Sequence, residues 1–278
     1  MKDLFITGLS GFVGTNIKRN LEKKYSIHSY QRNDEISINS SIVIHLAGKA
    51  HDTENSVNSN EYYETNTELT KKIFDCFLKS KAEVFIMLSS VKAVTDSSDK
   101  FITENEIPIP KTHYGKSKLL AEKYILTKNN PNNKRIYILR PCMIYGPGNK
   151  GNLNLLYNIV SSKIPWPLGA FKNKRSFCNI ENLSFVLNEL IVNKNILSGI
   201  YNIADDKPLS TNEIVSFICE TQQRTPVILK IPKTLIRFIA RLGDIINLPL
   251  NSERLKKLTE SYIVDNKKII NELEKPLP

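Results

Sequence analysis

A tyrosine and a lysine stand four residues apart, at Tyr114 and Lys118, in a stretch whose apolar residues recur every three or four positions over 113–128. This pattern predicts a helix that carries both side chains on one face, one turn apart. A tyrosine with its ordinary pKa of about 10 is a poor acid or base at neutral pH, but a neighbouring ammonium group favours the phenolate and lowers that pKa. Unless the pair is surface decoration, Tyr114 can therefore move a proton to or from a hydroxyl or carbonyl oxygen.

Two hydroxyl groups follow a predicted strand upstream of this pair. Val84–Leu88 is a continuous apolar run of the kind found in buried strands, and Ser89 and Ser90 come directly after it. The carboxyl ends of parallel strands face the ligand crevice of an open α/β sheet. A serine there can hydrogen-bond a reacting oxygen and stabilise a developing alkoxide, although a capping role would also account for the two residues.

Three glycines near the N-terminus suit the binding of a dinucleotide. Gly8 and Gly11 lie between the apolar run Leu4–Thr7 and a predicted helix over 12–23, and Gly14 lies in the first turn of that helix. Glycine at such positions allows a tight turn, the close approach of a pyrophosphate, and the packing of helix on strand without a Cβ atom. The helix N-terminus adds unpaired N–H groups and the positive end of the helix dipole.

The residues after the second predicted strand bear on which dinucleotide is bound. In an NAD site a carboxylate usually ends this strand and holds the ribose 2′-hydroxyl. Here 25–30 is followed by Gln31, Arg32 and Asn33, with no acid at the expected turn. Arg32 can pair with a 2′-phosphate through its planar guanidinium, which favours NADP and hence NADPH. The alternative is that Asp34 serves the ribose of NAD and that Arg32 is a solvated loop residue.

The order of the predicted elements indicates an α/β fold, because strand-like runs alternate with helical patterns. We predict a Rossmann-type, doubly wound parallel sheet. The dinucleotide-binding domain covers 1–147, some later segments return to it, and most of 148–278 forms a smaller C-terminal substrate-binding lobe. In that lobe Ser210 and Glu213 have the spacing of a capping box. The predicted strands are Leu4–Thr7, Ile42–Leu46, Val84–Leu88 and Ile136–Leu139, and the predicted helices cover 12–23, 61–79 and 113–128.

Composition limits the class of protein. With 278 residues, of which 41% are hydrophobic, the chain can form one large α/β domain and a smaller appendage. It has no run of about 18 apolar residues and no signal-peptide pattern, so we expect a cytoplasmic protein without a membrane span. The net charge of +11 arises from cations spread along the chain, which disfavours a nucleic-acid partner. We interpret the charge first as a bias in the composition of the whole proteome, and the alternative is a field that attracts anionic substrates. Four widely separated cysteines predict neither a metal site nor a disulfide framework.

Taken together, the motifs resemble those of the extended short-chain dehydrogenases/reductases, the NAD-dependent epimerase/dehydratase family. The resemblance covers nearly the whole chain and rests on the glycine turn at 7–14, His45–Gly48, Asn66, Ser89 and Ser90, Tyr114 with Lys118, and Arg140–Pro147. It implies that Ser90, Tyr114 and Lys118 form a catalytic triad and that Lys118 also holds the nicotinamide ribose. The cofactor contacts that it implies are Gly8, Gly11, Phe12, Val13, Gly14, Arg32, Leu46, Ala47, Gly48, Asn66, Tyr114, Lys118 and Pro141.

The second half of the chain is similar to a bacterial branch of this family that acts on UDP-linked sugars for surface polysaccharides. The similar stretches are 148–153 and 168–177. This likeness implies that Asn152 and Leu153 hold the uridine diphosphate and that Arg175 binds its phosphates, a role that suits a planar cation. The predicted substrate contacts are then Ser89, Ser90, Asn152, Leu153 and Arg175.

Three reactions are open to an enzyme of this type. Dehydratases of the family carry an acid pair after the strand-end hydroxyl, whereas Val91 and Lys92 follow Ser90 here, so dehydration is disfavoured. A 4-reductase uses NADPH once and releases it. The 31–33 turn, together with the resemblance of Ser-Ser-Val-Lys to 4-reductases, favours reduction of a UDP-4-keto-6-deoxy-N-acetylhexosamine in polysaccharide precursor synthesis.

The main alternative is a 4-epimerase of UDP-glucose or UDP-N-acetylglucosamine with retained NAD. A distant alternative is a non-catalytic family member that senses dinucleotide or binds RNA, but such proteins commonly lose the tyrosine or the lysine, and both are present. A homodimer is left open.

Overall fold

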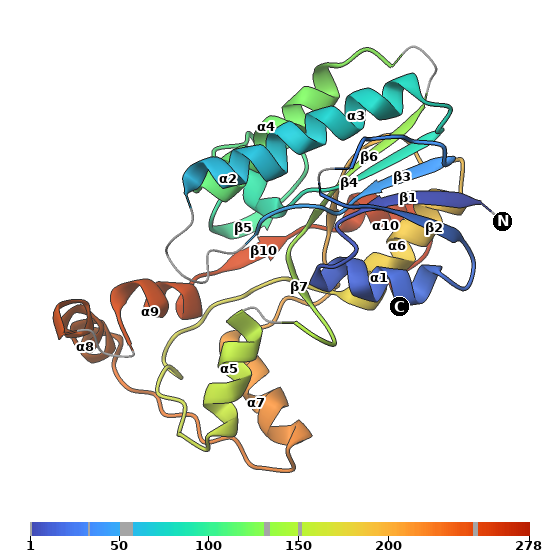
Figure 1. Cartoon of the computed structure of the whole chain (residues 1–278). Helices are drawn as coiled ribbons and strands as arrows, with labels where there is room; N and C mark the ends of the chain where they lie inside the picture. The colour runs from blue at the N-terminus through green and yellow to red at the C-terminus, as the bar shows by residue number, and fades with distance from the viewer. Residues whose placement is uncertain (1, 33, 51–57, 131–133, 150–151, 247–249) are drawn as a thin grey trace.

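The computed structural model describes residues 2–32, 34–50, 58–130, 134–149, 152–246 and 250–278. Six parallel strands form the central sheet in the order β2-β1-β3-β4-β6-β9 (Figure 1). The predicted α/β class and parallel sheet are confirmed. The strands are β1 (Asp3–Thr7), β2 (Ser26–Tyr30), β3 (Ile42–His45), β4 (Val84–Leu88), β6 (Arg135–Pro141) and β9 (Gly199–Ile203).

The chain reverses its direction across the sheet between β1 and β3. β1 pairs with β2 on one side and with β3 on the other, so the first connection leads toward one edge and the later connections lead toward the opposite edge. Such a reversal opens a crevice beyond the carboxyl ends of the strands. Gly8 and Leu46 directly follow β1 and β3 and therefore stand at that crevice.

Helices cover both faces of the sheet (Figure 1). Successive side chains of a strand point to opposite faces, and in β4 Ile86 packs toward one helical layer while Phe85 and Met87 pack toward the other. The first layer consists of α1 (Phe12–Leu21), α6 (Ile180–Val192) and α10 (Lys267–Leu273), and the second of α3 (Leu69–Lys79) and α4 (His113–Thr127).

The helix predicted over 61–79 contains a local irregularity. It consists of α2 (Ser59–Tyr63), a π-helical turn η1 (Glu64–Glu68), and α3. π-helical turns are rare in proteins, and those that occur are often found at functional sites. The turn in this protein carries Asn66, one of the predicted cofactor contacts.

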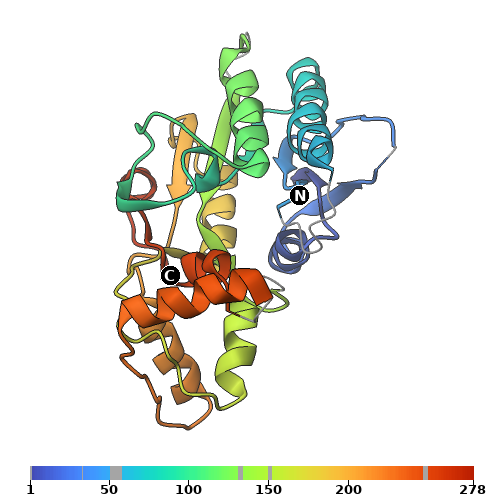
Figure 2. The same ribbon diagram turned by 90° about the vertical axis from the view of Figure 1, so that its left-hand side faces the viewer.

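A second apolar cluster lies apart from the sheet, around Trp166, Phe171 and Phe177 (Figure 2). One of its helices begins at the predicted capping box: the Ser210 hydroxyl accepts from Glu213 N, and the Glu213 carboxylate accepts from Ser210 N. Later segments also return to the sheet, as β9, α6 and α10. The helices of the second cluster are α5 (Asn152–Ser161), α7 (Thr211–Thr221), α8 (Lys233–Ile246) and α9 (Ser252–Thr259).

Short strands join the two clusters. In β7, Ile144 packs against the core of the sheet, whereas Met143 and Tyr145 pack against the second cluster. No helix in the described part of the chain is long and apolar enough to cross a membrane. The short strands pair as β7 (Met143–Tyr145) with β8 (Phe177–Asn179) and β5 (Ser98–Ile102) with β10 (Tyr262–Val264).

Candidate active site

The three glycines of the turn after β1 differ in their surroundings. Gly8 has a φ of 77°, a left-handed conformation that favours glycine, and a Cβ there would lie 2.6 Å from Ala47 N. A Cβ on Gly14 would lie 2.2 Å from Gly8 O, because α1 packs directly on the turn. Gly11 is exposed, and a Cβ there would meet Gly8 O at 3.5 Å. The turn is therefore closed at Gly8 and Gly14 and open at Gly11.

The open side of this turn is the N-terminus of α1. Gly11 is the N-cap, its helix receives no side-chain cap, and the first turn contains no acidic residue. Phe12 and Val13 follow and are half-buried. Uncapped N–H groups and the positive end of the helix dipole attract a phosphate group. These residues fit the pyrophosphate of a dinucleotide.

Buried hydrogen bonds join the ends of β1 and β3. Thr7 Oγ1 lies 2.7 Å from His45 Nδ1 and accepts from Ala47 N at 3.1 Å. His45 Nε2 lies 2.8 Å from Thr70 Oγ1, whose hydroxyl donates to Asn66 O. Because the Thr70 proton is used in that bond, His45 donates from Nε2 and accepts at Nδ1. Burial lowers the pKa of His45 to about 3, so the ring is neutral.

Asn66, Gly48 and Lys118 meet beyond the end of β3. Asn66 is fully buried, its Oδ1 accepts from Lys49 N at 2.8 Å, and its Nδ2 donates to Ser117 Oγ at 2.9 Å. A Cβ on Gly48 would lie 2.9 Å from Lys118 Nζ and 3.0 Å from Asn66 Oδ1. The predicted cofactor contacts that the structure brings together here are Leu46, Ala47, Gly48, Asn66 and Lys118.

The three predicted catalytic residues lie together at the end of β4. Tyr114 and Lys118 are on α4, and the side chains of Tyr114 and Ser90 are hydrogen-bonded. Lys118 Nζ donates to Leu88 O at 2.8 Å, and Ser90 Oγ accepts from Lys92 N at 3.2 Å. A hydroxyl pair and a buried ammonium group thus stand at one strand end, an arrangement that can pass a proton to a bound oxygen.

The predicted lowering of the Tyr114 pKa is wrong. Burial raises the pKa of Tyr114, and the hydrogen bond with Ser90 opposes that shift only in part. The Lys118 ammonium group is directed at Leu88 O, and burial lowers its own pKa to about 8 against the opposing effect of Glu122. The spacing in the sequence shows the neighbouring charge but not desolvation, which is the largest cause of the shift in the Tyr114 pKa.

Ser89 joins a buried ion pair behind the strand end. Its hydroxyl donates to the Glu122 carboxylate, which also accepts from Arg140 Nη2 at 2.6 Å and Nε at 3.0 Å. All three side chains are almost inaccessible to solvent. The Ser89 hydroxyl is already used in the bond to Glu122. The role of Ser89 as a substrate contact stays a prediction. Pro141, a predicted cofactor contact, ends β6 beside Arg140 and is buried.

The two candidates for recognising the adenosine ribose both follow β2. Arg32 is exposed and forms no ion pair with any described residue. The Asp34 carboxylate accepts from Gln31 N at 3.1 Å, so an acid does stand close to the end of this strand. Asn33, between them, lies outside the described residues.

The predicted substrate contacts of the second lobe are spread over two elements. Arg175 is half-buried and donates from Nη1 to Lys257 O at 2.6 Å, close to the end of α9. Burial lowers the pKa of Arg175. Asn152 and Leu153 begin α5, and 150–151, also part of the stretch singled out in the sequence, lie outside the described residues. The roles of these residues stay predictions.

Sequence reasoning missed two buried residues of the site, His45 and Glu122. His45 belongs to a motif that was recognised, but its bonds to Thr7 and Thr70 depend on strand pairing. Glu122 had a local signal, because it follows Lys118 by four residues and therefore shares its helix face. Its partner Arg140 lies on another element, and no spacing rule connects the two.

Comparisons with known proteins agree with this arrangement. The profile of the NAD dependent epimerase/dehydratase family matches residues 4–204. The chain is 30% identical to the UDP-glucose 4-epimerase of Vibrio cholerae over 77% of this chain and 74% of that protein. It is 28% identical to the N-acetyl-α-D-glucosaminyl-diphospho-ditrans,octacis-undecaprenol 4-epimerase of Escherichia coli O157:H7 over 96% and 88% of the two chains. The crystal structure of the UDP-N-acetylglucosamine 4-epimerase from Bacillus cereus shares the fold, with a TM-score of 0.77 at 19% identity over 100% of this chain and 94% of that one.

The glycine turn, the reversal of the sheet and the Tyr114–Lys118 pair define a dinucleotide-binding enzyme of the Rossmann type. The chain belongs to the NAD dependent epimerase/dehydratase family, the extended short-chain dehydrogenases/reductases. The resemblance recognised in the sequence is thereby confirmed. Membership of this family also confirms a nicotinamide dinucleotide, NAD or NADP, as the cofactor.

We expect different effects from two alanine substitutions in the glycine turn, one on stability and the other on dinucleotide binding. In Gly14→Ala the new Cβ would meet backbone atoms at 2.2 Å and 2.6 Å, so we expect a loss of about 1–3 kcal/mol in the free energy of unfolding. Gly11→Ala has room and should unfold like the unsubstituted protein, but it should bind NAD or NADP more weakly, because the methyl group stands where the pyrophosphate approaches. Urea unfolding and calorimetric titration measure the two effects, and equal stabilities of the two variants would contradict the packing argument.

The buried ion pair predicts a large effect of Glu122→Gln. Loss of the carboxylate charge leaves the Arg140 guanidinium buried without a counter-ion, so we expect a loss of about 3–5 kcal/mol in the free energy of unfolding. Glu68→Gln, at the exposed pair with Lys71, is the matched control and should lose less than about 1 kcal/mol. Similar midpoints of urea unfolding for the two variants would show that the buried pair does not stabilise the fold.

Proposed function

We propose that the enzyme oxidises and reduces C4 of a UDP-linked sugar as a 4-epimerase, with NAD retained in the site. The observation that carries the proposal is the hydrogen-bonded pair of Ser90 and Tyr114 at the end of β4, with the Lys118 ammonium group beside it. The three similar proteins named above are all 4-epimerases, which supports C4 as the reacting position. This choice reverses the order in which the sequence ranked reduction and epimerisation.

In this proposal the protein holds the sugar and moves one proton. When bound at the glycine turn, the dinucleotide supplies the hydride chemistry. The phenolate form of Tyr114 accepts the O4 proton as C4 is oxidised, and the resulting phenol returns that proton to O4 as C4 is reduced. The Ser90 hydroxyl donates a hydrogen bond to O4 while it carries negative charge. Lys118 holds the nicotinamide ribose, and a cation there opposes the effect of burial, which raises the pKa of Tyr114.

The position of Asp34 supports NAD as the retained cofactor. Its carboxylate is held by Gln31 N close to the end of β2, where an NAD site binds the ribose 2′-hydroxyl. A carboxylate there would repel a 2′-phosphate. Retention suits an epimerase, because the hydride removed from C4 must return to the same sugar.

The uridine diphosphate is proposed to lie against the lobe formed by most of 148–278. Arg175 supplies a planar cation for the phosphates, and Asn152 and Leu153 at the start of α5 contact the nucleotide. The net charge of +11 attracts such an anionic substrate over a distance. In the same proposal 1–147 is the dinucleotide-binding domain, and the protein acts in the cytoplasm.

A 4-reductase of a UDP-4-keto-6-deoxy-N-acetylhexosamine is the second candidate. Arg32 is exposed and forms no ion pair with a described carboxylate, so it is available for the 2′-phosphate of NADPH. The raised pKa of Tyr114 keeps its phenol protonated at neutral pH, which is the form that donates a proton to O4 in a reduction. In the dehydratase position, Lys92 lies over the ring of Tyr262 at 4.7 Å and offers no acid for elimination.

The role of Tyr114 predicts a specific loss of turnover. We expect Tyr114→Phe to lower kcat roughly 100-fold or more, because the acid–base group is removed, with little change in the affinity for the dinucleotide. Tyr124→Phe, on the same helix, loses a hydroxyl that bonds Asp75 away from the site and serves as the control. Steady-state kinetics and calorimetric titration separate the two effects. A Tyr114→Phe enzyme with near-normal kcat would remove this tyrosine from the mechanism.

The retained cofactor predicts catalysis without added dinucleotide. We expect the purified enzyme to carry NAD and to interconvert the two C4 epimers of a UDP-hexose or UDP-N-acetylhexosamine, as followed by NMR. Asp34→Asn should weaken NAD binding, whereas Arg32→Ala should leave it unchanged, because only NADP carries the 2′-phosphate. If the enzyme instead consumes one NADPH for each UDP-4-keto-6-deoxy sugar and does not interconvert epimers, the reductase replaces the epimerase.

A further inference from the structure

Helix α8 turns an apolar face toward solvent. Its inner face is fixed by the buried residues Ile236, Ala240 and Gly243, and a Cβ on Gly243 would lie 2.0 Å from Leu250 O, so the helix is held against the chain that follows it. At spacings of three and four residues, five large apolar side chains form the outer face. They are 40–77% exposed and comprise Leu235, Phe238, Leu242, Ile245 and Ile246. We call this set the α8 apolar face.

This helix stands at the outside of the molecule. α8 lies at the far left-hand edge in Figure 1, away from the sheet. In Figure 2, which views that side, α8 and α9 cross the front of the molecule between the sheet and the α5–α7 pair. Among the described helices and strands, neither view shows one that covers α8 from outside.

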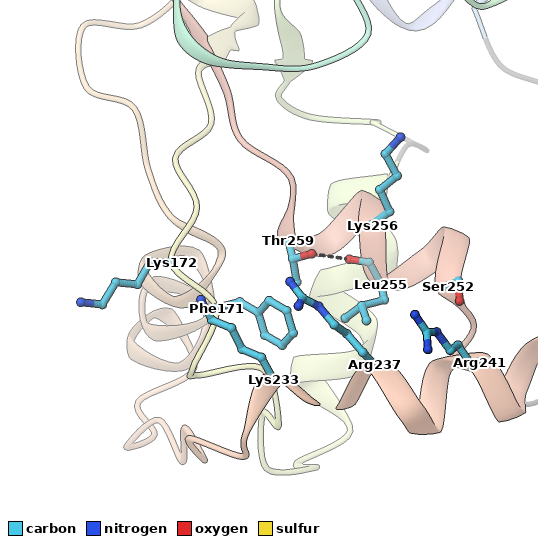
Figure 3. Close-up of a pocket in the computed structure, with 9 residues that line it drawn as sticks. All are labelled: Phe171, Lys172, Lys233, Arg237, Arg241, Ser252, Leu255, Lys256 and Thr259. Carbon is cyan, nitrogen blue, oxygen red and sulfur yellow. Dashed lines mark hydrogen bonds between the residues drawn. The ribbon is translucent and has the colours of Figure 1, made fainter. Parts of the chain in front are cut away.

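Cations line a hollow along the inner side of the same helix. Arg237 and Arg241 extend from α8 toward α9, and Figure 3 shows both guanidinium groups between the two helices. The acid in α8, Asp244, forms no ion pair with a described residue, and its carboxylate accepts from Ser252 N at 2.9 Å and from Ser252 Oγ. None of the described residues that line the hollow is acidic, although Lys256 pairs with Glu260 at 3.8 Å between Nζ and Oε1. The cations of the hollow are Lys172, Lys233, Arg237, Arg241 and Lys256. We call it the α8 cationic hollow.

An apolar face flanked by arginine and lysine side chains is the chemical pattern of a helix that lies in the surface of a membrane. The apolar side chains enter the boundary between head groups and acyl chains, and the cations pair with lipid phosphates. We propose that α8 docks this enzyme on a membrane surface that contains anionic phospholipid, with the α8 cationic hollow receiving the head-group phosphates. This docking is independent of which reaction the site performs at C4.

A second copy of the chain fits this surface less well. In a two-fold symmetric dimer the same patch faces itself, so the α8 cationic hollow of one copy would stand against the hollow of the other. Four of its cations, Lys172, Lys233, Arg237 and Arg241, form no ion pair with a described residue and would then repel their counterparts, whereas an anionic lipid surface neutralises them. Charge complementarity therefore favours lipid as the occupant.

Co-sedimentation with lipid vesicles tests the apolar part of the proposal. The whole protein should sediment with vesicles of phosphatidylcholine and phosphatidylglycerol and far less with phosphatidylcholine alone. Phe238→Ser with Ile245→Ser should weaken this partitioning about tenfold or more, because the inserted apolar area is lost. Phe217→Ser with Ile107→Ser is the matched control: these side chains are 64% and 82% exposed on other parts of the surface, and their loss should leave partitioning unchanged.

The charged part has its own pair of variants. Arg237→Gln with Arg241→Gln removes two cations four residues apart, and Arg19→Gln with Lys23→Gln removes two at the same spacing in and just after α1, on the opposite side of Figure 1. The α8 pair should abolish the dependence on phosphatidylglycerol, and the α1 pair should leave it intact. Added salt should weaken the binding of the unsubstituted protein, because lipid phosphates and cations are screened.

Three results would overturn the proposal. The first is the absence of sedimentation with anionic vesicles, and the second is an equal effect of the α8 variants and their controls. The third is that vesicle binding stays unchanged in the α8 variants while another property is lost. If they dissociate an oligomer on size-exclusion chromatography, the surface belongs to a second copy. If they lose UDP binding in calorimetric titration, it belongs to the nucleotide. For each variant, a midpoint of thermal unfolding equal to that of the unsubstituted protein shows that the fold is intact.

Discussion

The site depends on the bonds that the buried Glu122 carboxylate accepts. It accepts from Arg140 on β6 and from Ser89 directly after β4, and it lies on α4 together with Tyr114 and Lys118. Two strand ends and α4 are therefore joined at one group. A buried charge without its partner is costly, so the three elements can occupy only an arrangement in which the Glu122–Arg140 pair is formed. The same pair fixes α4 and with it the position of Tyr114 against Ser90.

Desolvation governs the chemistry at this strand end. It keeps His45 neutral with a pKa of about 3, raises the pKa of Tyr114, and lowers that of Lys118 to about 8. Because the folded state disfavours the charged form of Lys118, that lysine lowers the stability of the fold at neutral pH. This cost falls as the pH rises from about 8, the pKa of Lys118 in the fold, toward the ordinary pKa of a lysine. A bound substrate oxygen would meet groups whose charge water does not screen, which strengthens each interaction with a developing negative charge.

Local pattern predicted much of this protein. The sheet strands β1, β3, β4 and β6, the helix with Tyr114 and Lys118, and the capping box at Ser210 all follow from periodicity and spacing. The motifs also identified the family. What pattern could not supply is the set of contacts between distant segments. The pairing of Glu122 with Arg140 and the bonds of His45 to Thr7 and Thr70 exist because strands far apart in the sequence end at one edge.

The pKa of Tyr114 shows the same limit in physical terms. Spacing placed an ammonium group one helical turn away, but it gave no measure of burial, and burial decides the sign of the shift. The end of β2 is a further instance. No acid follows β2 at the expected offset, and the sequence offered Asp34 only as the alternative to Arg32. In the structure Gln31 N donates to the Asp34 carboxylate, so the turn holds this acid close to the end of β2.

The link between the two apolar clusters determines how the second cluster is held against the sheet. β6 ends at Pro141, and β7 follows after a single residue, with Ile144 in the core of the sheet and Tyr145 in the second cluster, where its ring meets Phe177 edge-on. A strand whose alternate side chains are buried in different cores cannot slip by one residue without exposing both sets. The second cluster is therefore held in register with the sheet rather than joined to it by a loose linker. Arg175, two residues before β8, is placed by the same pairing, because β8 is the partner of β7.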